Sequence, residues 1–562
     1  MTQLESRLLG RMEEEPKPVD ELSIGEFLIR RLQDYDIRDV FGIPGDYVLM
    51  FYSMLEHSPI NLVGCCREDN AGFAADAYAR VNGMGAVCVT YCVGGLSLAN
   101  SIAGAYAEKS PVIVITGSPG MRERANNPLL HHMVKDFRTQ LEVFEKLCVA
   151  ATELVDPTTA FREIDRVFEA AARHKRPGYI EIPRDMVKVV PGLPYEFRRA
   201  EPTSDPASLA EAASEAARLL STCKRPVIIA GVEVHRFNLH DDLMRLAEQA
   251  QIPIAATILS KSVVRETHPL YVGLYEGAMG HEEVTQFVEE SDCVLLLGAL
   301  LTDIDMGIYT AKLDPANCIY VTADELRIRS HYYHDVLLGD FIRALAEQNP
   351  TPPRREPPKV TTGSGEPYVL RADDQITITR LIARLDESLD ANTIVISDVG
   401  DALFAATELR THSRTEFIAP AYYTSMGFGV PASLGTGVAR PSMRTVVLVG
   451  DGAFQMTGNE LSNIVRNSFD HIIIVLDNKG YGTERFLHPG EFNEIHPWNY
   501  SKIPLVLGGG TGYEVSTEGE FDEALRKAWA DNSGMSLIQV HLPIDDCSAP
   551  LARLAERLSK RV

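Results

Sequence analysis

Short apolar runs recur along the chain, and amphipathic stretches with one charged face separate them. The runs are rich in Val and Ile and span residues 87–91, 112–116, 179–182, 227–230, 293–298, 393–397, 445–449 and 471–476. Apolar strands of this length that alternate with helices are typical of parallel sheets covered on both faces. The pattern therefore predicts an α/β fold throughout, with parallel sheets flanked by helices.

Two segments without periodicity, 191–206 and 349–366, are rich in Pro, Gly and charged residues. Such composition indicates linkers. They divide the chain into an N-terminal, a central and a C-terminal block, and we expect domains over residues 19–192, 205–350 and 367–562. Each block has a normal domain size.

The N-terminal and C-terminal blocks resemble each other in sequence. Residues 94–116 and 427–449 each contain a glycine-opened helix, a turn and a β-branched strand, and IPGDYVLMF at Asp46 matches DVGDALFAA at Asp401 in outline. A repeat of this size predicts a duplicated α/β domain. The alternative is two ordinary α/β units that look alike because of their fold.

The chain is acidic. It has 562 residues, with 54 Lys and Arg against 78 Asp and Glu, and a formal net charge of −24. Such a surface repels phosphate backbones and anionic lipid, which argues against nucleic acid and membrane as partners. The odd count of nine Cys, without zinc-site spacing or a secretion signal, fits a reducing compartment, and no apolar run is long enough to span a membrane. We expect a soluble, cytoplasmic protein.

Candidate chemistry follows two neighbouring strands of the C-terminal block. One strand ends at a Gly-Asp-Gly triplet, residues 450–452, and the next ends at Asp477 and is followed by NKGY, residues 478–481. Glycines let a backbone approach a phosphate closely, and a following helix offers free amide hydrogens. Oxygen ligands at two adjacent strand ends suit Mg²⁺. This edge therefore predicts a magnesium and phosphate site.

The order of these motifs resembles that of the thiamine-diphosphate-dependent 2-oxo acid decarboxylases. Further segments carry the resemblance: CREDNAGFAADAYAR around Glu68, FGIPGDY at Asp46, the pair His131–His132 and GYGTE at Glu484. The likeness runs from about Val19 to the C-terminus. It implies a pyrimidine-binding domain, a central Rossmann-like domain and a diphosphate-binding domain. The group includes pyruvate, indolepyruvate, phenylpyruvate and branched-chain 2-oxo acid decarboxylases.

The resemblance also implies a site. Thiamine diphosphate and Mg²⁺ are the implied cofactors, and Asp46, Glu68, His131, His132 and Glu484 are the implied catalytic residues. The implied cofactor contacts are Glu68, Gly400, Asp401, Thr424, Met426, Gly450, Asp451, Gly452, Ala453, Asn478, Gly480, Tyr481 and Thr483. The implied metal ligands are Asp451, Asn478 and Gly480. The implied substrate pocket contains Leu403, Phe404, Met426 and Thr483, with residues 545–558 as a lid.

Some positions depart from the family pattern. Asp477 stands where Asn is common, Ala453 and Asp401 where Ser or Thr is common, Thr424 where Gly is usual, and Met426 where the decarboxylases usually have Ile. The metal ligands are kept. The central block lacks a G-x-G-x-x-G fingerprint, so no nucleotide is expected there.

The implied reaction is non-oxidative decarboxylation of a 2-oxo acid to an aldehyde and carbon dioxide through a thiamine-diphosphate ylide. Leu403, where several relatives have an aromatic residue, and the small Thr483 favour a bulky apolar or aromatic side chain, while pyruvate stays a candidate. Two alternatives stay open: a carboligase of the acetolactate-synthase or benzaldehyde-lyase type, and a cofactor-binding regulatory paralogue. The resemblance implies a homodimer or homotetramer with the site at a dimer interface.

Overall fold

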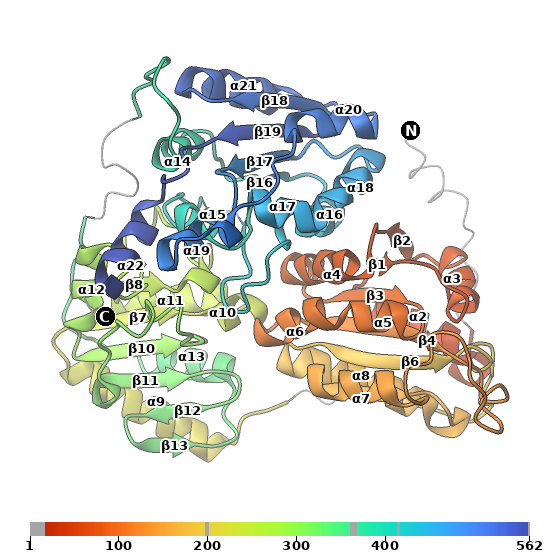
Figure 1. Cartoon of the computed structure of the whole chain (residues 1–562). Coiled ribbons are helices and arrows are strands. Elements are labelled where there is room, and N and C mark those ends of the chain that lie inside the picture. Colours follow the sequence, from red (N-terminus) through yellow and green to blue (C-terminus); the bar gives the residue numbers. More distant parts are fainter. Residues whose placement is uncertain (1–16, 197–201, 360–367, 413–415, 560–562) are drawn as a thin grey trace.

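The computed structural model describes residues 17–196, 202–359, 368–412 and 416–559, and three sheets organise them (Figure 1). Residues 1–16 and the linker portions 197–201 and 360–366 lie outside the described residues. Each sheet falls inside one of the three expected blocks, although the domain bounds themselves stay a prediction. The expected strands are all present within a residue or two of their predicted positions.

The N-terminal sheet contains six parallel strands in the order β2-β1-β3-β4-β6-β5. Their bounds are β1 Asp39–Gly42, β2 Asn61–Gly64, β3 Gly85–Val89, β4 Val112–Ser118, β5 Ala150–Glu153 and β6 Gly178–Pro183. The helices around it are α2 Ile24–Asp34, α3 Leu49–Glu56, α4 Glu68–Asn82, α5 Val93–Ser97, α6 Ala99–Ala107, α7 Thr139–Leu147 and α8 Pro157–His174. Every residue of β3, β4 and β6 is buried, as apolar runs between two helical layers require.

The central sheet has seven strands in the order β13-β12-β11-β10-β7-β8-β9, antiparallel only at the β11-β12-β13 end. Its strands are β7 Pro226–Ala230, β8 Ile254–Ala256, β9 Tyr271–Leu274, β10 Cys293–Leu297, β11 Cys318–Val321, β12 Leu326–Ile328 and β13 His331–Tyr333. Its helices are α9 Pro206–Thr222, α10 Val232–Arg236, α11 His240–Ala250, α12 Glu282–Glu289 and α13 Leu338–Glu347.

The C-terminal sheet is again parallel, in the order β15-β14-β16-β17-β19-β18. Its strands are β14 Thr393–Ser397, β15 Glu416–Ile418, β16 Arg444–Gly450, β17 Ile472–Asp477, β18 Thr511–Val515 and β19 Ser536–His541. Its helices are α14 Ile378–Asp386, α15 Asp401–Ala406, α16 Gly429–Ala439, α17 Asp451–Thr457, α18 Leu461–Arg466, α19 Gly482–Leu487, α20 Ile503–Leu507, α21 Glu518–Ala530 and α22 Ala549–Ser559. The predicted α/β class with parallel sheets is confirmed.

The N-terminal and C-terminal sheets share one topology. Numbered from its own first strand, each has the order 2-1-3-4-6-5. The predicted match of the Asp46 and Asp401 segments agrees, because both follow the first strand of their sheet. The predicted match of residues 94–116 with 427–449 is wrong by one βα unit. It makes β4 the equivalent of β16, whereas the strand order makes β3 the equivalent of β16. Glycine-opened helices before β-branched strands recur in successive βα units, so this local pattern does not fix the register.

The two similar blocks pack together through α4 and α16, the helices that precede the third strand of each sheet. Both helices are rich in small residues, and a Cβ added to Gly435 of α16 would lie 2.0 Å from the carbonyl oxygen of Ala74 in α4. The helices can approach this closely only because glycine has no side chain. One apolar core therefore runs through both blocks.

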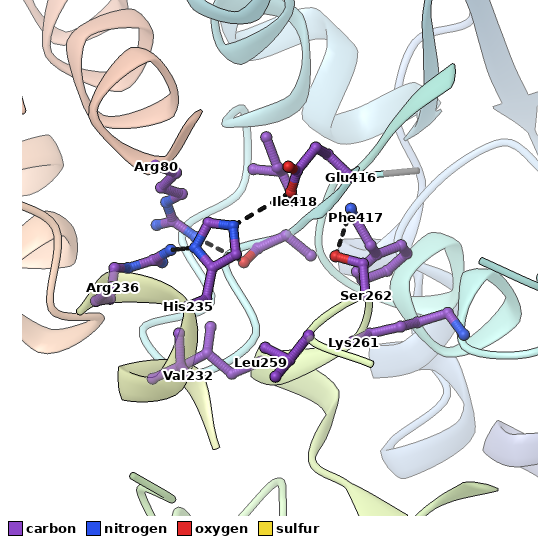
Figure 2. A pocket seen from close by; sticks show the side chains of 12 residues that line it. Arg80, Val232, His235, Arg236, Leu259, Lys261, Ser262, Glu416, Phe417 and Ile418 are labelled. Atoms are coloured by element: carbon purple, nitrogen blue, oxygen red, sulfur yellow. Dashed lines mark hydrogen bonds and ion pairs between the residues drawn. The ribbon is translucent and has the colours of Figure 1, made fainter. Parts of the chain in front are cut away.

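A small polar cavity lies where all three blocks meet (Figure 2). Arg80 of α4, Arg236 of α10 and Glu416 of β15 line it, and His235 binds Glu416 with 3.2 Å between Nε2 and Oε2. Arg80 is held by Asp76 and Glu108, and burial beside Arg80 lowers the pKa of Arg236 to about 9. The His235–Glu416 contact joins the central block to the C-terminal block, and a buried ion pair of 2.9 Å between Lys109 and Glu233 joins it to the N-terminal block.

Candidate active site

The carboxyl ends of β16 and β17 bring two predicted site segments together. These strands are adjacent, with Gly450 opposite Leu476. Asp451 opens α17, and its carboxylate accepts hydrogen bonds from the backbone N–H groups of Gly452, at 2.7 Å, and Gly480, at 3.0 Å. Adjacent strand ends thus place Asp451 beside the loop that contains Asn478 and Gly480.

The environment of Asp451 suits a cation. Its residue is 1% exposed, and burial, with a smaller contribution from the nearby Asp477 carboxylate, raises its pKa to about 7. Among the described residues, no Lys, Arg or His pairs with it. A divalent cation would favour the ionised carboxylate, and carboxylate, amide and carbonyl oxygens are ligands that Mg²⁺ accepts. The donor set of Asp451, Asn478 and Gly480 therefore fits Mg²⁺, and its coordination stays a prediction.

Asp477, the departure from the usual Asn, has partners of its own. Its Oδ2 accepts a hydrogen bond from Nε2 of Gln539 at 2.8 Å and lies 3.0 Å from Nδ1 of His541. Both partners lie on the neighbouring strand β19. A buried carboxylate is tolerated when it is paired and hydrogen-bonded. The substitution thus leaves the nearby oxygen ligands in place.

Two further predicted contacts lie side by side at the same edge. Gly400 has φ of +82°, and a Cβ built on it would lie 3.4 Å from Oγ1 of Thr483. Oγ1 of Thr483 is buried and has no hydrogen-bond partner among the described residues. Gly452 lies against the ring of Tyr481, where an added Cβ would come within 2.6 Å of Cε1. An unpaired buried hydroxyl beside glycine backbone fits a polar ligand such as a diphosphate.

The backbone that follows Met426 is fixed by a carboxylate that the sequence did not single out. Asp398, at the end of β14, is fully buried and accepts hydrogen bonds from the N–H groups of Gly427, at 3.1 Å, and Gly429, at 2.7 Å. Burial raises the pKa of Asp398 to about 6. Thr424 adopts φ of +54°, a conformation that glycine adopts without strain, which accounts for the Gly that the family usually has there. Met426 itself is 40% exposed.

Asp401 binds the C-terminal segment. Its carboxylate accepts a hydrogen bond from the N–H of Ser548 at 2.9 Å and another from the Ser548 hydroxyl. Ser548 directly precedes α22, the helix within the predicted lid. Leu403 and Phe404 are buried and share an apolar core with Leu551 of that helix. The predicted lid therefore packs over the predicted substrate pocket, while a direct contact of Asp401 with cofactor stays a prediction.

Glu68 opens α4 in the N-terminal block and is half-buried. Its carboxylate has no hydrogen bond or ion pair within the described part of the chain. The chain on both sides of it is anchored by Glu460 of the C-terminal block, whose Oε2 accepts from the N–H of Cys66, at 3.0 Å, and from Nδ2 of Asn70, at 2.7 Å. Glu460 stands in the GNELSN segment after the Gly-Asp-Gly triplet, yet nothing in that segment indicates its distant partners.

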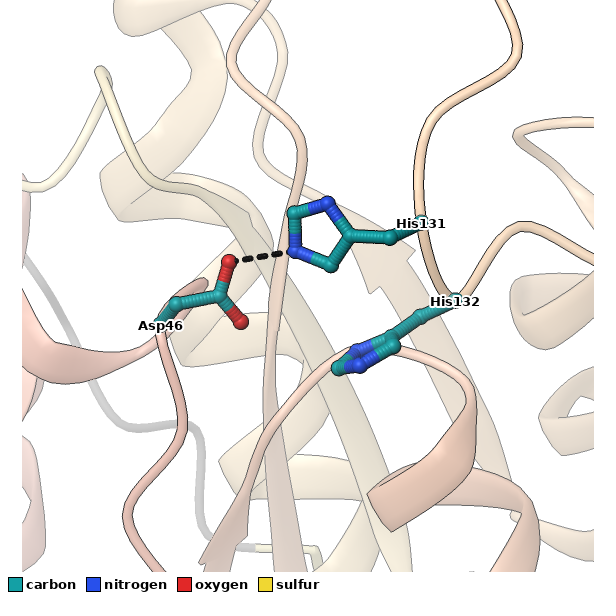
Figure 3. Close-up of side chains that lie close together, drawn as sticks. All are labelled: Asp46, His131 and His132. Carbon is teal, nitrogen blue, oxygen red and sulfur yellow. Dashed lines mark hydrogen bonds and ion pairs between the residues drawn. The ribbon is translucent and has the colours of Figure 1, made fainter.

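Asp46, His131 and His132 form one cluster (Figure 3). Asp46 follows β1, and the His pair lies on the loop between β4 and α7. Nε2 of His131 lies 2.6 Å from Oδ2 of Asp46, while Nδ1 of His131 lies 3.3 Å from the hydroxyl of Tyr47. The two His rings are in edge contact, with centroids 4.8 Å apart, and Nδ1 of His132 is buried without a hydrogen-bond partner among the described residues. The predicted proton-transfer group is thus assembled except for Glu484.

Glu484 lies elsewhere in the chain. It sits on α19 beside the C-terminal sheet and is exposed, whereas the cluster lies on the N-terminal block (Figure 1). Within the described residues, no hydrogen bond or ion pair joins Glu484 or Asp451 to Asp46, Glu68, His131 or His132. Within one chain, the predicted site residues thus fall into two groups that no described hydrogen bond or ion pair joins.

Comparison with known families identifies the fold. Residues 22–143 match the N-terminal TPP binding domain of thiamine pyrophosphate enzymes, residues 213–348 match the central domain and residues 398–540 match the C-terminal TPP binding domain. The chain belongs to the thiamine pyrophosphate enzyme family. Its N-terminal and C-terminal blocks are hence the two domains that bind thiamine pyrophosphate, also called thiamine diphosphate, and the central block is the middle domain of this family.

Curated relatives match almost the whole of this family member. An indole-3-pyruvate decarboxylase of Azospirillum brasilense is 35% identical, over 95% of this chain and 98% of the relative. A probable pyruvate decarboxylase of Schizosaccharomyces pombe is 32% identical, over 94% and 95% respectively. An alpha-keto-acid decarboxylase of Mycobacterium avium is 33% identical, over 93% and 94%. No described helix is both long and apolar enough to cross a membrane.

Proposed function

We propose that this thiamine pyrophosphate enzyme decarboxylates a 2-oxo acid without oxidation, giving an aldehyde and carbon dioxide, with Mg²⁺ holding the diphosphate at Asp451. The observation that carries the proposal is the cluster of Asp46, His131 and His132, which offers a carboxylate and two imidazoles within one hydrogen-bonded group. An aldehyde product requires a proton at the carbon that loses carbon dioxide. Imidazoles titrate near neutrality and are suited to that delivery. The names of the three relatives agree with this reaction.

The roles follow from the contacts. When bound, thiamine diphosphate supplies the carbon nucleophile that attacks the ketone and accepts the electron pair left by carbon dioxide. The carboxylate of Glu68 has no partner among the described residues. It would form a hydrogen bond with a ring nitrogen of the cofactor and share a proton with it. Asp46 holds a proton at Nε2 of His131, and Tyr47 fixes the other nitrogen of that ring. Nδ1 of His132 can exchange a proton without breaking a hydrogen bond.

The active form we propose is a homodimer or a dimer of dimers, with each site built from two chains. The side chains of His131 and Asp46 are 60% and 40% exposed in one chain, and Met426 is 40% exposed. Loss of carbon dioxide is favoured where water is excluded, so these groups need a covering surface. The C-terminal block of a second chain, which carries the exposed Met426, would supply it for Asp46 and His131, and those residues would in turn cover Met426.

Complementation between two inactive variants tests this arrangement. Glu68→Gln and Asp451→Ala chains with different tags are co-expressed, and the mixed dimers are purified. If each site takes Glu68 from one chain and Asp451 from the other, half of the sites in a mixed dimer are intact, and about half of the parent activity per dimer is expected. If both residues of a site came from the same chain, every site would carry a substitution and the mixed dimer would be inactive.

For the substrate, we propose a 2-oxo acid with a bulky apolar or aromatic side chain. The argument is the volume left by Leu403 and Thr483, as each added buried methylene contributes about 0.8 kcal/mol when a pocket accepts it. The experiment supplies thiamine diphosphate, Mg²⁺ and a panel of pyruvate, 4-methyl-2-oxopentanoate, phenylpyruvate and indolepyruvate, and measures carbon dioxide and organic products. We expect aldehydes, with a higher kcat/KM for the bulky acids. Hydroxyketones from a 2-oxo acid alone would indicate a carboligase, and no turnover would indicate a regulatory paralogue.

A further inference from the structure

Three cysteines line one cavity of about 220 Å³ on the central domain, far from the proposed active site in the sequence. Cys223 ends α9, Cys293 opens β10 and Cys318 opens the neighbouring strand β11. Cys223 is partly exposed, whereas Cys293 and Cys318 are 3% and 6% exposed. The cavity thus gives solvent a route to one thiol with two buried thiols beside it.

A carboxylate clamp holds the first two cysteines together. Asp292, directly before Cys293, accepts hydrogen bonds from the N–H of Lys224, at 2.9 Å, and of Arg225, at 2.7 Å. These two residues directly follow Cys223. The backbone that leaves α9 is therefore fixed against the start of β10, and β7, which begins at Pro226, continues alongside β10 with Pro226 opposite Cys293. The hydrogen bonds to the Asp292 carboxylate and the pairing of β7 with β10 thus keep the end of α9 next to the start of β10.

The two thiols line the same cavity, and the Cys223 thiol donates a hydrogen bond to the carbonyl oxygen of Leu220 at 3.1 Å. The adjacent Cys293 thiol lowers the pKa of Cys223 below the ordinary thiol value, while Cys223 and burial raise the pKa of Cys293. Cys318 also donates to a backbone carbonyl, that of Asp314 at 3.2 Å, but burial raises its pKa to about 11. The thiolate is the reactive form of cysteine. Cys223 is thus accessible from the cavity, has a pKa below the ordinary thiol value and lies beside the buried Cys293 thiol.

We propose that Cys223 and Cys293 form a reversible dithiol–disulfide pair, with a hydroperoxide as oxidant and a low-molecular-weight thiol as reductant. The Cys223 thiolate attacks the outer oxygen of the hydroperoxide, breaks the O–O bond and becomes a sulfenic acid, while the leaving oxygen departs as water or an alcohol. The Cys293 sulfur then attacks the sulfenic sulfur, and water leaves as the S–S bond forms. The two sulfurs together lose two electrons, which the hydroperoxide takes up. Two molecules of the external thiol return both cysteines to the reduced state.

This site is separate from the proposed active site: among the described residues, no hydrogen bond or ion pair joins Cys223, Cys293 or Cys318 to a residue of that site. Its covalent bond would join the end of α9 to the start of β10 within one domain.

The test uses the full-length reduced protein, treated with a small molar excess of hydrogen peroxide and then with a thiol-blocking maleimide. Trypsin separates the three cysteines, because Cys223 falls in residues 219–224, Cys293 in 266–312 and Cys318 in 313–327. We expect mass spectrometry without reduction to find 219–224 joined to 266–312. The count of free thiols should fall by two from nine, and dithiothreitol should restore it.

Variants make the assignment specific. Cys223→Ser and Cys293→Ser should each abolish the linked peptide, while Cys66→Ser, which removes an exposed thiol of the N-terminal domain, should leave it unchanged. Circular dichroism confirms that each variant is folded before oxidation. A link to 313–327 instead, oxidation of Cys223 only to sulfinic acid, or a linked peptide that survives Cys293→Ser would overturn the proposal.

Discussion

Replacing Glu460 by alanine is expected to weaken the junction between the N-terminal and C-terminal domains and to displace Glu68. Glu460 is fully buried, and it accepts three hydrogen bonds. Two come from the turn that begins the helix of Glu68, and the third comes from Nδ2 of Asn463 at 2.8 Å. Alanine removes the carboxylate acceptor from all three donors, so that Nδ2 of Asn70 keeps only its 3.2 Å contact with Oδ1 of Asn459 and Nδ2 of Asn463 only its 3.5 Å contact with the sulfur of Cys66. The turn that presents Glu68 to the cofactor then loses its anchor.

The magnitude follows from those contacts. A hydrogen bond to a charged group contributes about 1.5–3 kcal/mol, but burial of the carboxylate offsets part of the sum. The offset is visible in Glu460, whose pKa is raised chiefly by burial. We expect Glu460→Ala to lower the free energy of unfolding by about 3–5 kcal/mol, because each neutral donor that loses its acceptor costs about 1–3 kcal/mol and removal of the buried carboxylate returns part of that sum. Glu460→Gln keeps one acceptor oxygen, and the expected loss is about 1–3 kcal/mol.

The assay is urea unfolding followed by circular dichroism, together with aldehyde formation at saturating thiamine diphosphate and Mg²⁺. Glu523→Ala is the control, because Glu523 is exposed and pairs only with Lys527 on its own helix, so both readouts should match the parent. The expected order of stability is parent and control, then Glu460→Gln, then Glu460→Ala, with turnover falling in the same order. Parent-like unfolding and turnover in Glu460→Ala would refute the anchoring role of this carboxylate.

Three further predictions concern the metal, the pH dependence and the pocket. Asp451→Ala should bind thiamine diphosphate much more weakly in calorimetry and should lose the dependence on Mg²⁺; equal affinity with and without Mg²⁺ in the parent would contradict the metal assignment. Burial and the nearby Glu408 carboxylate raise the pKa of Glu276 to about 8. The contribution of Glu276 to the free energy of unfolding is therefore complete below the ordinary carboxyl pKa and is lost as the pH rises towards 8. In urea titrations we expect the unfolding free energy of the parent to decline between pH 5 and 8 and Glu276→Gln to flatten that decline; an unchanged decline would mean that another group causes it. Thr483→Trp should lower kcat/KM for phenylpyruvate more than for pyruvate in steady-state assays, and an equal loss for both acids would place Thr483 outside the substrate pocket.

The strands and the Gly-Asp-Gly edge could be predicted from sequence because local signals determine them. An apolar, β-branched run such as 445–449 has few alternatives to a buried strand, and the glycines that follow it end the strand. The carboxyl ends of adjacent parallel strands meet by topology, so Asp451 and Asn478 could be expected to lie close together. Which strand of one domain corresponds to which strand of the other could not be predicted, because successive βα units share the same local pattern.

Residues whose partners are distant could not be found in this way. Glu460 and Asn70 lie 390 positions apart, and neither segment carries a signal for the other. Asp398 likewise stands in an ordinary strand end, and only the fold shows that its carboxylate holds Gly427 and Gly429 in place beside Met426. The Asp46 and His131 contact was predicted through family resemblance, because 85 positions separate the two residues.

Turnover of a 2-oxo acid labelled with ¹³C at its carboxyl carbon, carried out in D₂O with thiamine diphosphate and Mg²⁺ and followed by NMR, tests the proposed reaction most directly. The account predicts that the label appears only as carbon dioxide and bicarbonate, and that the aldehyde carries deuterium on its carbonyl carbon, delivered through the Asp46, His131 and His132 cluster. A carboxylic acid as the main product, or retention of the label in the organic product, would contradict non-oxidative decarboxylation, and a hydroxyketone as the main product would contradict release of an aldehyde.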